Sequence, residues 1–169
     1  MAKPPATSYP GYFQKYIDLV TEEDLMTAFK KQLPGIQSLL ASVPEDKGTY
    51  AYAVGKWTLK ELLQHIIDAE RIFAYRALCF ARGEEQSLPG FEENDYAANS
   101  NADNRTWQSL VEEYLAVRHC TELLFKSFSK KALASIGTAN NNKQSVESTG
   151  FIILGHTQHH MNVMKERYL

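Results

Sequence analysis

Apolar residues recur every three or four positions in four long segments of the chain, the spacing of one face of an α-helix. The segments are residues 21–42, 58–83, 106–128 and 146–167. A helix with one apolar face is stable in water only when that face packs against another element. The sequence therefore predicts an all-α protein, and specifically a four-helix bundle.

Local signals mark where these helices begin and end. Thr58 with Glu61 three residues later forms a capping-box pattern, and Gly83 is a typical residue just after a helix C-terminus. Thr21, followed by three acidic residues, is the expected N-cap of the first helix. Pro34 lies within that helix, so a kink is expected there.

The connection between the second and third helices is long and polar, running from Gly83 to Arg105. Its ~20 residues at ~3.3 Å each can span a bundle ~35 Å long. We therefore expect helices two and three to be parallel and helix four antiparallel to both, with a simple up-and-down order as the alternative. The chain is expected to form one domain, 1–169, in which the proline- and aromatic-rich residues 1–20 pack as an N-terminal arm.

Charge and cysteine content restrict the classes of partner. The formal net charge of -2 gives no electrostatic reason to expect nucleic acid or an anionic membrane as a partner. No apolar run approaches the ~18 residues of a membrane span, and the N-terminus lacks an apolar stretch of signal-peptide length. The two cysteines, Cys79 and Cys120, lie far apart in helical segments, so we expect no disulfide framework and a cytoplasmic location.

The most informative motif is a group of histidines in the last helix. His156 and His160 are four residues apart, which places their Cβ atoms ~5–6 Å apart on one helix face, a suitable spacing for one metal ion. A third ligand must come from another helix, and His65 is the best-placed candidate because it lies at a similar depth. Three neutral imidazoles plus solvent form an open site of the catalytic kind.

Other interpretations of these residues compete with the metal site. A lone histidine beside an apolar face is more often a hydrogen-bonded core residue, but several buried imidazoles are costly without partners. Thr157 stands where a zinc peptidase of the H-E-x-x-H type carries its glutamate base, so that class is disfavoured. We expect His159 at the rim and His119 in solvent, and Asp68 either orients His65 or is an ordinary surface carboxylate.

Two segments carry a resemblance to a known family. Residues 55–78 read GKWTLKELLQHIIDAERIFAYRAL, and residues 150–169 read GFIILGHTQHHMNVMKERYL. Together they resemble the DinB/YfiT-like family. The resemblance implies an up-down-down-up four-helix bundle and a divalent metal held by His65, His156 and His160. Nickel, zinc, manganese and iron occur in such proteins, some of which are thiol S-transferases and others metal-dependent hydrolases.

These observations lead to a hypothesis and one alternative. The expected protein is a metal-dependent enzyme, either a hydrolase or an S-transferase using a low-molecular-weight thiol, that acts on a small molecule. Nitrogen ligands favour zinc or nickel, with manganese or iron as further candidates. The alternative is a non-catalytic, metal-stabilised binding or dimerisation module linked to stress. The loops at residues 89–104 and 137–142 are expected to shape the pocket, and a homodimer is expected by analogy with the family.

Overall fold

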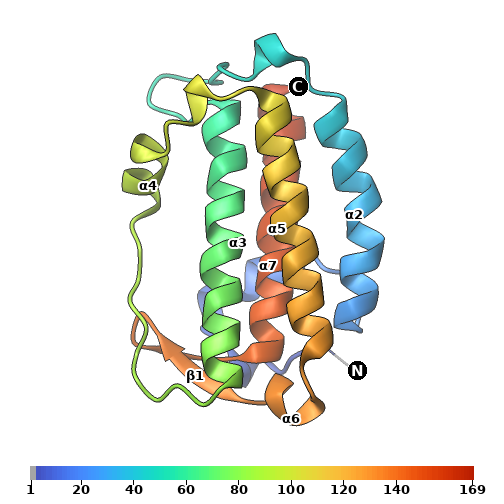
Figure 1. Cartoon of the computed structure of the whole chain (residues 1–169), viewed down its shortest axis with the longest axis vertical. Helices are drawn as coiled ribbons and strands as arrows, with labels where there is room; N and C mark the ends of the chain where they lie inside the picture. The colour runs from blue at the N-terminus through green and yellow to red at the C-terminus, as the bar shows by residue number, and fades with distance from the viewer. Residues whose placement is uncertain (1–2) are drawn as a thin grey trace.

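The computed structural model describes residues 3–169 and is built around four long helices (Figure 1). These are α2 (Leu25–Ala41), α3 (Leu59–Ala81), α5 (Trp107–Ser127) and α7 (Val146–Val163). Helices α3 and α5 run in the same direction, and α2 and α7 run in the opposite one. The predicted four-helix bundle with up-down-down-up order is therefore confirmed.

The helix ends follow the local signals with one exception. The Thr58 hydroxyl accepts from the backbone N–H of Glu61, whose carboxylate accepts from the N–H of Thr58, so the capping box is present. Gly83 has a φ of 84°, the left-handed conformation in which a side chain is strained. The N-cap predicted at Thr21 is wrong: Asp24 caps α2 by accepting from the N–H of Thr27, because only a side chain directly before the helix reaches its first free N–H groups.

The long connection does more than return the chain across the bundle. It contains the short helix α4 (Glu93–Asn99) and a 3₁₀ turn, η4 (Ala102–Asn104), and it runs beside α3 to the end where α3 began. A second 3₁₀ turn, η3 (Glu45–Lys47), lies at the same end between α2 and α3. This route allows α5 to run parallel to α3, as the length of the connection predicted.

The segment predicted as a second polar loop is instead a β-hairpin. After the short helix α6 (Lys130–Leu133), strand β1 (Ile136–Ala139) pairs antiparallel with β2 (Asn142–Ser145). Two left-handed asparagines, Asn140 and Asn141, form the turn, with φ of 48° and 59°. Asparagine tolerates this conformation, and a two-residue turn of this kind matches the twist of a hairpin.

The N-terminal segment packs across α7. It forms two 3₁₀ turns, η1 (Ala6–Ser8) and η2 (Gly11–Phe13), and the short helix α1 (Gln14–Ile17). Phe13 and Ile17 are buried in the same apolar cluster as α7. A Cβ atom at Gly155 would lie 2.0 Å from the carbonyl oxygen of Tyr16, so only glycine permits this close contact between α1 and α7. Residues 1–2 of the predicted arm lie outside the described part of the chain.

A buried polar network ties the four long helices together. Arg118 of α5 is 0% exposed and donates to both carboxylate oxygens of Glu70 on α3, at 2.8 to 3.2 Å. It also donates to Gln32 of α2 at 2.9 Å and to Thr157 of α7 at 3.0 Å. The network therefore fixes the relative depth of α3 and α7, the two helices that carry the candidate metal ligands.

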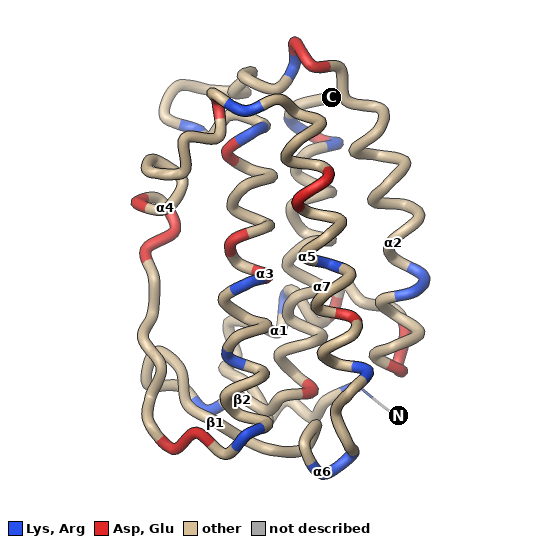
Figure 2. The backbone as a smooth tube through the Cα atoms, viewed as in Figure 1, with Lys and Arg blue, Asp and Glu red and all other residues tan. Residues whose placement is uncertain are grey.

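The chain ends in a turn that packs against the start of α3. The helix predicted to end near residue 167 changes after α7 into a π-helical turn, η5 (Met164–Tyr168), whose Tyr168 hydroxyl donates to the Trp57 carbonyl at 2.8 Å. In the view of Figure 2, charges of both signs occur along α3 and α5 and at both ends of the bundle. Within residues 3–169, no helix has the length and apolar composition needed to cross a membrane.

Candidate metal centre

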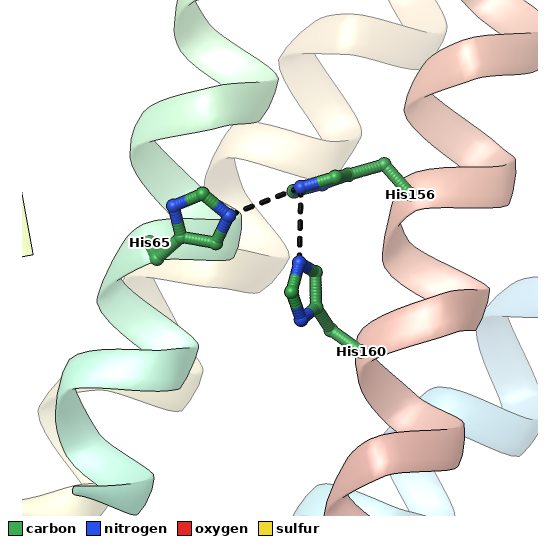
Figure 3. Close-up of side chains that lie close together, drawn as sticks. All are labelled: His65, His156 and His160. Carbon is green, nitrogen blue, oxygen red and sulfur yellow. Dashed lines mark hydrogen bonds between the residues drawn. The ribbon is translucent and has the colours of Figure 1, made fainter. Parts of the chain in front are cut away.

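Three imidazoles from two antiparallel helices converge at one point in the bundle (Figure 3). His65 extends from α3, and His156 and His160 extend from successive turns of α7. The Nε2 atom of His156 lies 3.0 Å from Nε2 of His65 and 3.1 Å from Nε2 of His160. One ring nitrogen from each histidine lies within 4.8 Å of those of the other two. The structure therefore brings together the three histidines selected from the sequence.

Hydrogen bonds within the cluster cannot satisfy all three rings. Both short contacts use the same atom, Nε2 of His156. A neutral ring nitrogen has either one proton or one lone pair, so this atom can form only one strong hydrogen bond. A cation, in contrast, accepts one lone pair from each ring. Zinc–nitrogen bonds of about 2.0–2.1 Å place tetrahedral nitrogens roughly 3.4 Å apart, close to the two contacts of 3.0 and 3.1 Å, so the residues present fit a divalent ion.

Burial keeps these rings neutral, which is the protonation state that a metal requires. His65 and His156 are 6% and 8% exposed. Burial lowers the pKa of His65 from 6.5 to about 4, and burial with the nearby charge of His65 lowers the pKa of His160 to about 2. Burial, followed by the charge of His160, holds the pKa of His156 well below its usual range. At neutral pH all three rings are uncharged and can donate lone pairs.

Aromatic side chains hold the rings in place. The Trp57 ring lies against His65 with centroids 4.7 Å apart, and the Tyr16 ring meets His156 edge-on at 5.5 Å. Tyr16 also contacts His159 at 5.5 Å. These contacts restrict the imidazoles to the orientation in which their Nε2 atoms converge. Trp57 lies just before α3 and Tyr16 lies in α1, so segments outside the bundle helices complete the centre.

Two cavities reach the histidines from different sides. The larger, of about 330 Å³, exposes His65 and His156, and the smaller, of about 290 Å³, exposes His160 with Trp57 and His159. Glu93 of α4 lines both of them. The centre is thus accessible to small molecules rather than closed like a structural site.

The predicted loops do shape the larger cavity. Its wall includes Gly90 and Phe91 from the long connection and Ala139 and Asn140 from the hairpin. The hairpin and the long connection are joined there by two backbone hydrogen bonds of 2.9 Å: the Leu88 N–H donates to the Thr138 carbonyl of β1, and the Asn140 N–H of the turn donates to the Leu88 carbonyl. The asparagine-rich turn is therefore part of the cavity wall as well as a solvated turn.

The remaining sequence candidates take ordinary positions. His159 is half-buried at the edge of the smaller cavity, and His119 is exposed, as expected for both. Asp68 accepts from the side chain of Gln64 at 2.9 Å, and no bond to His65 is found among the described residues. Asp68 is half-buried, and burial raises the pKa of its carboxyl group. Its role as a partner that orients His65 is therefore not supported.

Sequence reasoning missed several residues of the larger cavity. Tyr12 and Lys15 reach it from the N-terminal segment, which was expected to pack but not to line a pocket. From the sequence alone, Arg76 reads as an ordinary salt-bridging helix residue, as do Glu70 and Arg71. It instead lines the cavity and donates to the carbonyl oxygen of Pro89 at 2.9 Å. The available signal was its position eleven residues after His65, three helical turns along the same face.

The fold and the histidine cluster define a class of bundle protein with a centre suited to one metal ion. The family model of the DinB superfamily matches residues 28–164. The chain belongs to this superfamily, as its resemblance to DinB/YfiT-like proteins predicted. A comparison with curated protein sequences finds no match.

Two solved structures share the fold at low sequence identity. YfiT from Bacillus subtilis, described as a probable metal-dependent hydrolase with an unusual four-helix bundle topology, is 11% identical with a TM-score of 0.74. That alignment covers 97% of this chain and 90% of YfiT. The mycothiol-dependent maleylpyruvate isomerase is 11% identical with a TM-score of 0.65, over 92% of this chain and 60% of the isomerase. At such identity the likeness concerns the fold alone.

Proposed function

We propose that the protein is a metal-dependent enzyme in which His65, His156 and His160 bind one divalent ion. The observation that carries the proposal is the convergence of three Nε2 atoms, from the buried His65 and His156 and the half-buried His160, on one point that two cavities reach. Zinc and nickel suit an all-nitrogen ligand set best, and manganese and iron are further candidates.

Hydrolysis of a small-molecule substrate is the first candidate reaction. A divalent ion bound by three imidazoles acts as a Lewis acid and makes a nucleophile available near neutral pH. The chain's own contribution is to hold the substrate in the larger cavity and to accept a proton. We propose that the carboxylate of Glu93 accepts this proton. Glu93 is the one acid among the described residues that line the two cavities. YfiT, with the same fold, is itself described as a probable metal-dependent hydrolase.

Transfer of a low-molecular-weight thiol is the second candidate reaction. The specific observation in its favour is the pair of cavities on different sides of the histidines, which offers separate room for a thiol and an electrophile. The isomerase with the same fold depends on the thiol mycothiol. Thiol transfer and hydrolysis share the metal centre and differ in the nucleophile that reaches it.

The non-catalytic alternative predicts a different kind of centre. A module that keeps a metal for stability needs a closed coordination shell. The cavities of about 330 and 290 Å³ that reach the histidines are not expected for such a closed site. We therefore favour the enzyme.

The metal hypothesis is tested by elemental analysis of protein purified without a histidine tag. We expect about one divalent ion per chain, and at least tenfold weaker binding in His65→Ala or His160→Ala. His119→Ala is the matched control because His119 is exposed and lies outside the cluster. Equal metal content in wild type and in the His65→Ala/His160→Ala double variant would refute the metal site.

The reaction is tested with two screens of the metal-loaded protein, one of esters and amides and one of thiols with electrophiles. Glu93→Gln is expected to reduce hydrolysis more than tenfold, because the amide cannot accept the proton. The variant is expected to leave metal content unchanged. Turnover in neither screen, at full metal occupancy, would favour the binding module.

Assembly and location remain predictions. The aromatic residues Tyr9 and Phe13 of the N-terminal segment are buried in the protein's own core, whereas Tyr12 is 55% exposed. We propose a homodimer in the cytoplasm, with a small molecule and neither nucleic acid nor a membrane as its partner. A monomeric mass by light scattering at tens of micromolar protein would contradict the dimer.

A further inference from the structure

The larger cavity contains a buried cation with no acidic partner. Arg76 of α3 is only 7% exposed. Its Nη2 group donates to the Pro89 carbonyl at 2.9 Å, and its guanidinium lies 5.4 Å from the centroid of the Phe73 ring. None of the ion pairs among the described residues includes it. A guanidinium has several N–H donors, and one carbonyl uses only one of them.

A buried charge without a counter-charge lowers the stability of the fold, which suggests that Arg76 has a function that requires its charge. Arg118, the other deeply buried arginine, has the carboxylate of Glu70 as its partner. Arg76 has instead a cavity, which it lines together with His65 and His156. The structure thus leaves the remaining donors of Arg76 beside a space that a ligand can enter.

The cavity extends from the histidines to Arg76 along one face of α3. His65, Ala69, Phe73 and Arg76 follow one another at helical spacing, and all four line it. Eleven residues of helix separate the Cα atoms of His65 and Arg76 by about 16 Å. Helical side chains lean toward the N-terminus of their helix, so the side chain of Arg76 extends from its Cα atom in the direction of the histidines. Ala69 and Phe73 give the cavity an apolar floor between its two polar ends.

The charge of the cavity favours an anion. Lys15 and Arg76 contribute two positive charges to its lining, against one negative charge from Glu93. Burial raises the pKa of Tyr12, so its hydroxyl is neutral and can donate a hydrogen bond near Arg76. A bound divalent ion would increase the positive potential further.

We propose that Arg76 binds a carboxylate at the far end of the substrate, which places an apolar chain over Ala69 and Phe73 and the reacting group at the histidines. This inference rests on the proposed function and adds to it the class of substrate: a small acid with an apolar middle. A carboxylate fits better than a phosphate because one guanidinium at this end matches a single negative charge and a planar pair of oxygens.

The experiment compares two probes of equal length, mercaptohexanoate and mercaptohexanamide, which differ only in the charge at the end distant from the thiol. Binding to the zinc-loaded protein is measured by calorimetry. We expect the acid to bind at least tenfold more tightly than the amide, since a charge-assisted pair replaces a neutral contact. Arg76→Gln should remove the preference, and Arg76→Lys should retain part of it.

Arg82→Gln is the matched control. Arg82 follows α3, is exposed and lies outside the cavity, so its replacement should leave the preference unchanged. A purely structural role for Arg76, anchoring Pro89, predicts equal weakening of both probes in Arg76→Gln. That result, or equal affinity of the two probes for wild type, would overturn the proposal.

A second measurement separates this inference from the metal hypothesis. In metal-free protein, the Nε–H resonance of Arg76 is followed by NMR during titration with hexanoate or hexanamide. A shift caused by the acid alone supports the carboxylate site even if the chain binds no metal. The absence of any shift at saturating acid would refute it, even if metal content and turnover are as proposed.

Discussion

Acidification of the metal-free protein should reduce its stability at a pH where most proteins show little change. The cause is the burial of neutral histidines. Burial lowers the pKa of His65 to about 4, while the unfolded chain has a value near 6.5. Between these values the unfolded state binds a proton that the folded state does not, so the free energy of unfolding falls as pH falls. The loss is complete below the folded-state pKa, and no loss occurs above the unfolded one.

The magnitude follows from the size of the pKa difference. Each unit of pKa is worth about 1.4 kcal/mol, so the shift of His65 from 6.5 to about 4 corresponds to roughly 3 kcal/mol. His156 and His160 are lowered further, by burial and then by their histidine neighbours. With all three rings neutral when folded, the slope is ~3 kcal/mol per pH unit near pH 6 and approaches ~4 kcal/mol per pH unit near pH 5, where the unfolded histidines are almost fully protonated. This is a large fraction of the stability of a typical domain.

Urea unfolding of metal-free protein between about pH 7 and pH 5 measures this slope, in a range above the usual titration of carboxylates. The matched control replaces His65, His156 and His160 with glutamine, which is polar but does not titrate. We expect a steep slope in wild type and a much shallower one in the triple variant. A flat wild-type profile, or equal slopes in the two proteins, would refute the argument that the three rings are buried and neutral.

Added metal should raise the same profile without changing its slope. A metal binds the folded chain through neutral imidazoles, and in the metal-free folded chain these rings are already neutral above the pKa of His65, about 4. The stabilisation by metal is therefore expected to be the same at pH 7 and at pH 5, and to be lost only as the pH falls toward 4. No stabilisation by metal in this range, or an equal stabilisation of the triple glutamine variant, would show that these histidines are not the ligands.

Two further predictions concern the supports of the centre. Arg118→Met should cost about 3–5 kcal/mol in urea unfolding because it leaves Glu70 charged and buried. Adding Glu70→Gln should recover part of this loss. Gly155→Ala should cost about 1–3 kcal/mol because the new methyl group meets the carbonyl oxygen of Tyr16. Gly35→Ala, at a helical site with nothing within 4 Å, should instead stabilise by about 0.5–1 kcal/mol, and equal effects of the two glycine variants would contradict the close-contact argument.

The parts of the fold that could be predicted are those encoded locally. The capping box at Thr58 and the left-handed Gly83 each depend on a few neighbouring residues, and both are as expected. The hairpin was missed for the opposite reason. Its two strands have only four residues each, and contacts distant in sequence support them: Leu88 bonds to β1, and Gly137 lies so close to Phe80 that a Cβ atom would clash at 1.8 Å. Such support cannot be recognised from a short polar segment alone.

The same distinction applies within the site. The pairing of His156 with His160 is a property of one helix, so four residues of spacing were enough to predict it. The role of Arg76 depends on what covers α3. The sequence shows many charged neighbours, which suggested a salt bridge, but the long connection lies over this residue and offers it the Pro89 carbonyl instead of an acid. Among the described residues, Arg76 has no acidic partner because the segment that covers it offers a carbonyl group and no carboxylate. The same unpaired charge makes this end of the cavity suitable for binding a carboxylate.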